Sequence, residues 1–74
     1  MSSKIMRLIY PPSLLREPIL TQLIKRSELT INILQAQITL EEGWLEVEFS
    51  GSAEEIERAI EWLKVEGIEV TSVD

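Results

Sequence analysis

The sequence predicts a small α+β domain in which two helices cover one face of a four-stranded antiparallel sheet. Alternating segments rich in β-branched residues indicate strands near residues 4–10, 29–40, 44–50 and 68–73. Apolar residues at helical spacing indicate helices near residues 17–27 and 53–66. The resulting order is βαββαβ. With right-handed crossovers, we expect the strands to lie in the order fourth, first, third, second.

The first strand and the first helix are marked by alternation and by prolines. One side of the strand carries Met6, Leu8 and Tyr10, and the other carries Ile5, Arg7 and Ile9. Pro11 and Pro12 end the strand, because proline cannot donate a hydrogen bond to a sheet. Pro18 suits a first helical turn. The helix then presents one apolar stripe, made of Ile19, Leu20, Leu23 and Ile24.

The second strand is expected at an edge of the sheet. Its alternation assigns Leu34, Ala36, Ile38 and Leu40 to one face, and it assigns to the other face Ile31, Ile33, Gln35 and Gln37. No proline and no charged residue occurs between Thr30 and Leu40, so nothing protects this edge against pairing. We therefore expect this edge, or the helix-free face of the sheet, to bind a partner.

A turn at Gly43 makes a hairpin with the third strand, and a capped helix follows. The third strand directs inward Leu45, Val47 and Phe49, and outward Trp44, Glu46 and Glu48. Ser52 and Glu55 form a capping box, in which the serine caps the helix and the glutamate reaches back. The buried stripe of this helix is Ile56, Ala59, Ile60 and Leu63. Gly67 is expected to end the helix in a left-handed conformation.

Composition limits the functions that the chain can perform. Its 74 residues suffice for one small domain, residues 1–74, and they include neither cysteine nor histidine. The commonest general base and metal ligand is therefore missing, so we expect no catalytic residue, no metal and no cofactor. The net charge of −6 disfavours nucleic acid, and no apolar run is long enough for membrane insertion. We expect a cytoplasmic protein that is not an enzyme.

Several of these features occur together in a known family. The Asn32-Ile33-Leu34 triplet on the second strand, with Pro18, Ala36, Gly43 and Gly67, resembles the pattern of the NIL domain over nearly the whole chain. The resemblance implies a ferredoxin-like fold similar to that of amino-acid-sensing ACT domains. It also implies a place at the C-terminus of methionine-importing ABC transporter ATPases, where paired domains bind methionine and restrain transport, or a place before ferredoxin modules. The short segment before the first strand favours the placement before a ferredoxin module.

The resemblance implies a ligand site near the second strand. Asn32 is expected to hold the polar end of an amino acid, methionine first, while Ile33 and Met6 accept an apolar side chain. Two other interpretations stay open: Asn32 hydrogen-bonds locally and serves structure, and Ile33 and Met6 pack in the core. Trp44 and Trp62 are either interface anchors or local packing groups.

Two functions from different classes follow. In the first, the chain is a regulatory amino-acid-binding domain, either as part of a ferredoxin-type protein or otherwise attached. In the second, it is a docking or dimerisation module that binds no small ligand. Both imply a second copy or an attached domain as partner. The expected interface residues are Ile5, Ile9, Ile31 and Trp44.

Overall fold

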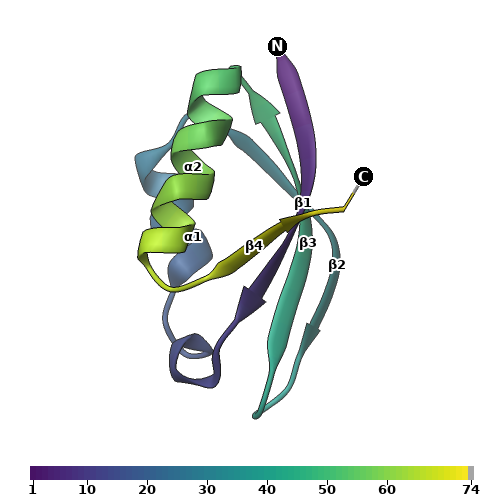
Figure 1. Cartoon of the computed structure of the whole chain (residues 1–74), viewed down its shortest axis with the longest axis vertical. Coiled ribbons are helices and arrows are strands. Elements are labelled where there is room, and N and C mark those ends of the chain that lie inside the picture. The colour runs from purple at the N-terminus through teal and green to yellow at the C-terminus, as the bar shows by residue number, and fades with distance from the viewer. Residues whose placement is uncertain (74) are drawn as a thin grey trace.

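The computed structural model, which describes residues 1–73, has an antiparallel sheet with both α-helices on one face (Figure 1). The strand order is β2–β3–β1–β4, and the strands are β1 (Ser2–Tyr10), β2 (Thr30–Ile38), β3 (Gly43–Gly51) and β4 (Glu69–Ser72). The helices are α1 (Ile19–Arg26) and α2 (Ala53–Val65). The predicted ferredoxin-like α+β fold and its strand order are confirmed. Asp74, the last residue of the predicted domain, lies outside the described residues.

The core lies between the sheet and the helices. Register places Leu8 opposite Leu45 and Met6 opposite Val47, with these side chains directed toward the helices. Leu45, Val47 and Phe49 are 5%, 0% and 0% exposed, as the alternation of β3 predicts. They pack with buried residues of both helices, among them Leu23, Ile56 and Leu63. Burial of such side chains stabilises the fold by about 1.5–3 kcal/mol each.

β2 departs from the predicted alternation at its centre. Ile33 pairs with Val47 but Gln35 pairs with Glu46, so Leu34 is an extra residue in a β-bulge. One extra residue reverses the alternation that follows it. Ile31 and Ile33 therefore share the helix-facing side with Ala36 and Ile38, and the prediction that they lie on opposite faces is wrong.

The α1 region also differs in detail. A short 3-10 helix, Pro12–Leu14, precedes α1 and was not predicted. α1 begins at Ile19, so Pro18 is the residue before the helix rather than part of its first turn. The stripe is confirmed for Ile19 and Leu23, which are buried, but Ile24 is 54% exposed. The buried face of α1 is therefore narrower than predicted, with one buried residue in each of its two turns.

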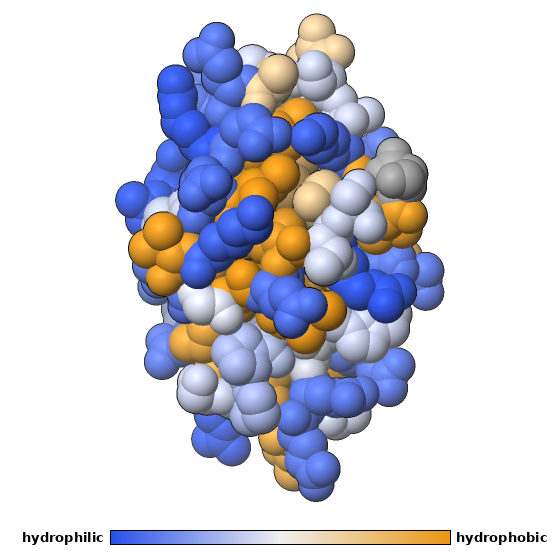
Figure 2. All heavy atoms as spheres, viewed as in Figure 1, coloured by the Kyte–Doolittle hydropathy of each residue, from blue (hydrophilic) through white to orange (hydrophobic). Residues whose placement is uncertain are grey.

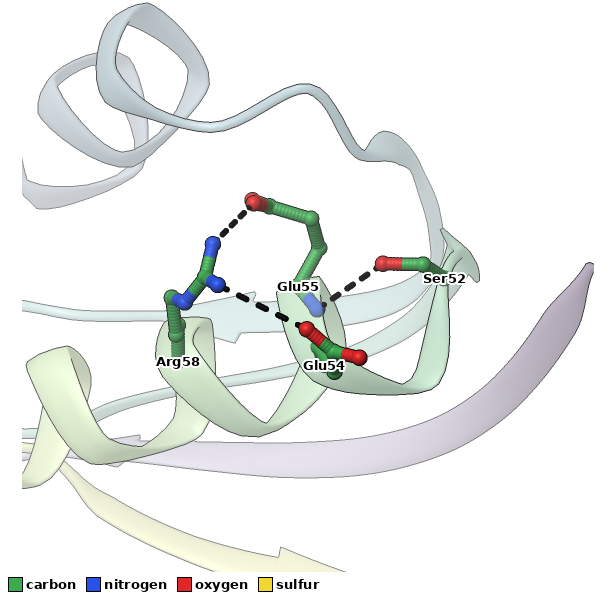
Figure 3. A network of polar contacts seen from close by, with 4 residues as sticks. All are labelled: Ser52, Glu54, Glu55 and Arg58. Carbon is green, nitrogen blue, oxygen red and sulfur yellow. Dashed lines mark hydrogen bonds and ion pairs between the residues drawn. The ribbon is translucent and has the colours of Figure 1, made fainter.

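α2 has a well-formed cap at each end. The Glu55 backbone N–H donates to Ser52 Oγ at 3.1 Å, as predicted. The Glu55 carboxylate does not complete the capping box; it accepts from Arg58 at 2.6 Å, and Arg58 also lies 3.7 Å from Glu54 (Figure 3). At the other end Gly67 has a φ of +101°, and its N–H donates to the Lys64 carbonyl at 3.1 Å. These bonds fix where α2 ends and β4 begins.

Candidate functional site

The residues predicted to bind a ligand do not converge in one copy of the chain. Asn32 pairs with Glu48 and lies, exposed, on the helix-free face of the sheet. Ile33 is the next residue and faces the helices, with 54% of its surface exposed. Met6 also faces the helices but is only 6% exposed, and it belongs to the core. Of the three, Ile33 lines an open hollow that is described next.

That hollow lies where the segment between β1 and α1 meets the helix-facing side of β2. It measures about 230 Å³ and is mainly apolar, with walls that include Tyr10, Leu15, Pro18, Leu20, Ile33 and Ile38. Glu17 and Thr21 add polar groups at its rim. The Tyr10 phenol is uncharged at neutral pH, and burial raises its pKa above the ordinary value. The arrangement suits a small ligand that combines an apolar side chain with polar groups.

A second hollow continues along β2 toward the β2–β3 turn. It measures about 510 Å³ and shares Leu15 and Ile38 with the first. Gly43 makes this arrangement possible, because a Cβ built there would lie 2.5 Å from Leu15 Cδ2. Leu15 therefore reaches down onto the sheet and forms a wall common to both hollows. Sequence reasoning used Gly43 only as a turn residue and missed this role.

The helix-free face carries a polar network at its centre. Glu46 Oε1 accepts from Arg7 Nη2 at 3.0 Å and from Gln35 Nε2 at 3.3 Å, and the Glu46 side chain is only 8% exposed. The Arg7 guanidinium lies 4.6 Å from the centre of the Trp44 ring. Long side chains therefore cover the middle of this face.

The predicted interface residues divide between the two faces. Ile5, Ile9 and Trp44 lie half-buried on the helix-free face, around the Arg7–Glu46 pair. Ile31 lies on the other face, opposite Phe49, and packs against the core. Ile31 precedes the bulge, and there the alternation of β2 directs its side chain to the core side of the sheet. Whether any of these residues meets a partner stays a prediction.

A third hollow separates α1 from α2. It measures about 260 Å³ and is lined by Leu23, Arg26, Ser27, Glu55, Arg58, Ala59 and Trp62. The Arg26 guanidinium lies 4.8 Å from the centre of the Trp62 ring and closes one side. Trp62 thus packs across the edges of the two helices.

Neither a metal site nor a membrane span is found in the part of the chain that the structure describes. Within residues 1–73, no group of three or more histidine, cysteine, aspartate or glutamate side chains comes together to hold a metal ion. In the same range, no helix is long and apolar enough to cross a membrane.

Comparison with known proteins gives a consistent result. A family model for the NIL domain matches residues 4–72. "Methionine import ATP-binding protein MetN" of Helicobacter pylori strain J99 is 37% identical over 73 residues, and that of Helicobacter acinonychis strain Sheeba is 34% identical. Each match covers 93% of this chain but 22% of the relative. The crystal structure of a C-terminal domain of an ABC transporter / ATP-binding protein from Enterococcus faecalis superimposes with a TM-score of 0.83. It is 24% identical, and the match covers 95% of this chain and 82% of that one.

Proposed function

We propose that this chain, which belongs to the NIL domain family, is a regulatory domain that binds methionine and reports its presence to a larger assembly. One observation carries the proposal: relatives named for methionine import match 93% of the chain at 34–37% identity. The chain spans 22% of the relative from strain J99, so most of that ATP-binding protein lies outside the match. We expect no catalytic activity from the chain itself.

We propose that the methionine side chain binds in the hollow that Ile33 lines. Its apolar walls, Tyr10, Pro18 and Ile38 among them, suit a flexible thioether, and about 230 Å³ accommodates a small ligand. Asn32 lies on the other face of the same edge strand, so it contacts the ligand only if the ligand's polar end passes around the strand edge. Met6 is too buried to touch a ligand in this conformation. We therefore expect the walls of the hollow, and not Met6, to contact the apolar side chain of the ligand.

Calorimetry with L-methionine tests this proposal. We expect saturable heat for the wild-type chain, and a loss of about 1–3 kcal/mol in binding free energy when Ile33→Asp puts a charge in the hollow. Asn32→Ala is expected to weaken binding by about 0.5–3 kcal/mol if Asn32 holds the polar end. Val65→Asp, at an exposed position of α2, is the matched control and should bind as the wild type does. Melting temperatures establish that each variant is folded.

The second candidate is a docking module without a small ligand. It is favoured by the exposed apolar side chains of β2, which serve a protein partner as well as a ligand. No heat with millimolar methionine, and no thermal shift with any of the twenty amino acids, would favour this second function. A ligand hundredfold above its Kd should stabilise the fold by about 2.7 kcal/mol, so such a shift is easily measured.

The remaining expectations concern the setting of the domain. We propose a cytoplasmic location and a partner that is either a second copy or an attached domain. The link to a ferredoxin-type protein stays a prediction. A cysteine motif encoded in the gene after codon 74 would support it.

A further inference from the structure

Arg26 and Ser27, at the C-terminal end of α1, carry polar groups that have no hydrogen-bond partner among residues 1–73. The Ser27 hydroxyl oxygen is buried, and no donor or acceptor of the described chain reaches it. The Arg26 guanidinium lies 4.8 Å from the centre of the Trp62 ring, but an indole offers no acceptor for its N–H groups. Because buried polar groups are normally hydrogen-bonded, the Ser27 hydroxyl calls for a partner.

Both residues line the hollow of about 260 Å³ that separates α1 from α2, which we call the α1–α2 hollow. Its walls also include the buried side chains of Leu23 and Ala59 and the half-buried ring of Trp62. A hollow that joins apolar walls to a few polar groups is the usual form of a small-ligand site. The α1–α2 hollow shares no lining residue with the hollow that Ile33 lines.

The charges around the α1–α2 hollow favour an anion. Glu55 lines it, but the Glu55 carboxylate accepts from Arg58 at 2.6 Å, and Glu54 lies 3.7 Å from the same guanidinium. Figure 3 shows Arg58 held between these two carboxylates. Of the charged side chains that line the hollow, all of them within residues 1–73, Arg26 is the one without an oppositely charged partner. The hollow therefore offers an uncompensated positive charge.

We propose that the α1–α2 hollow binds a small organic acid, a carboxylate carried on a short apolar chain. The planar guanidinium of Arg26 matches the two oxygens of a carboxylate, and the Ser27 hydroxyl donates a further hydrogen bond. The apolar chain packs against Leu23 and Ala59. An ammonium group is disfavoured, because Arg26 repels it and Glu55 is already paired. The site thus selects acids without an amino group, and it is independent of methionine binding.

The acidic surface of α2 opposes the approach of an anion. Glu54, Glu57 and Glu61 are exposed on this helix, and Figure 2 shows hydrophilic side chains over much of its outer surface. At physiological ionic strength, exposed charges more than about 8 Å apart are largely screened from one another. The contacts with Arg26 and Ser27 are direct, so they determine the affinity once the ionic strength is fixed.

Titration of the full chain with sodium butyrate, followed by nitrogen–proton correlation spectra, tests the proposal. The Trp62 indole N–H reports on the α1–α2 hollow, and the Trp44 indole N–H on the helix-free face is an internal control. Trp44→Phe assigns the two signals. At constant ionic strength and without methionine, we expect a saturable shift at Trp62 and none at Trp44. Butyramide, which has a similar shape but no charge, should bind about tenfold more weakly or worse.

Matched variants locate the carboxylate. Arg26→Gln should raise the butyrate dissociation constant about tenfold or more, because it removes the charged donor. Lys25→Gln is the control: it removes the same charge from the preceding exposed residue, which does not line the hollow, and should bind as the wild type does. Ser27→Ala should raise the dissociation constant about threefold or more, and it provides a second test if Arg26→Gln fails to fold.

Four results would overturn the proposal. The first is the absence of a shift at Trp62. The second is an equal loss in Arg26→Gln and Lys25→Gln, which would mean that butyrate responds only to net charge. The third is equal binding of butyramide, which would leave an apolar hollow without an anion site. The fourth is tighter binding of inorganic phosphate, which would assign the hollow to a different anion. None of these results bears on methionine in the hollow that Ile33 lines.

Discussion

β2 and β3 are neighbouring strands of nine residues each, and they differ far more in burial than in sequence pattern. Both alternate and both are rich in apolar residues. On β3 the helix-facing residues Leu45, Val47 and Phe49 are at most 5% exposed, whereas on β2 the corresponding Ile33 and Ile38 are 54% and 64% exposed. β3 has a strand on each side and α2 above it, but β2 has a single neighbour. Alternation thus identifies a strand, while its place in the sheet determines how much of it is buried.

The largest expected effect comes from truncating a helix-facing side chain on each of the two strands. Phe49→Ala should lower the free energy of unfolding by about 3–5 kcal/mol, because it leaves a cavity in a fully buried site. For a domain with about 5 kcal/mol of total stability, this leaves much of the chain unfolded. Ile33→Ala should cost about 1 kcal/mol or less, since half of that side chain is already in water.

Urea denaturation followed by circular dichroism measures both values. Leu63→Ala provides a second buried site from α2 and should behave as Phe49→Ala does. Equal losses at positions 49 and 33 would contradict the comparison, because they would mean that β2 is covered in solution. Performing the titration over a range of protein concentrations separates coverage by a second copy from a different fold.

A smaller effect is expected for the polar residues of β3. Glu46→Ala removes the acceptor of both Arg7 and Gln35 and should cost about 1–3 kcal/mol, because these donors then lose a protein partner. Glu48→Ala, two residues along on the same face and less buried, is the control and should stay within about 0.5 kcal/mol of the wild type. Gln35 belongs to β2, so Glu46 is one of the side chains that tie the bulged strand to the centre of the sheet.

Thermal melts of the two variants give the comparison directly. An unchanged melting temperature for Glu46→Ala would show that the network is loose in solution. That result would also mean that the Arg7–Glu46 pair does not hold in place the side chains that cover the middle of the helix-free face.

The fold could be predicted from sequence because several local signals agree with one topology. Each signal predicted a different element or boundary: alternation predicted β1 and β3, the Ser52 cap predicted the start of α2, and Gly67 predicted its end. The bulge at Leu34 could not be predicted in this way. Both faces of β2 carry apolar residues, so a reversal of the alternation leaves the hydrophobic pattern almost unchanged.

The candidate site was harder to predict than the fold, for a related physical reason. Adjacent residues of a strand point to opposite faces, so the Asn32-Ile33 pair cannot line one hollow. Sequence reasoning placed Ile33 at the site but could not find Leu15 or Pro18, which reach it through the irregular segment between β1 and α1. No periodic signal describes such a segment, because its path depends on the tertiary contact between Leu15 and Gly43.

The smallest effect expected here concerns Tyr10, the residue of β1 that lines the hollow left open by β2. Burial raises the pKa of its phenol above the ordinary value of 10. Below that pH the phenol is neutral in both the folded and the unfolded chain, so its ionisation does not make stability depend on pH. Above it the unfolded chain loses the proton more readily, and stability falls as pH rises.

Melting temperatures measured between about pH 9 and about pH 11 should therefore fall more steeply for the wild type than for Tyr10→Phe. The difference between the two curves isolates the contribution of the Tyr10 phenol. Parallel curves would mean that the phenol is as well solvated in the folded chain as in the unfolded chain, and that Tyr10 is not a buried wall of the hollow.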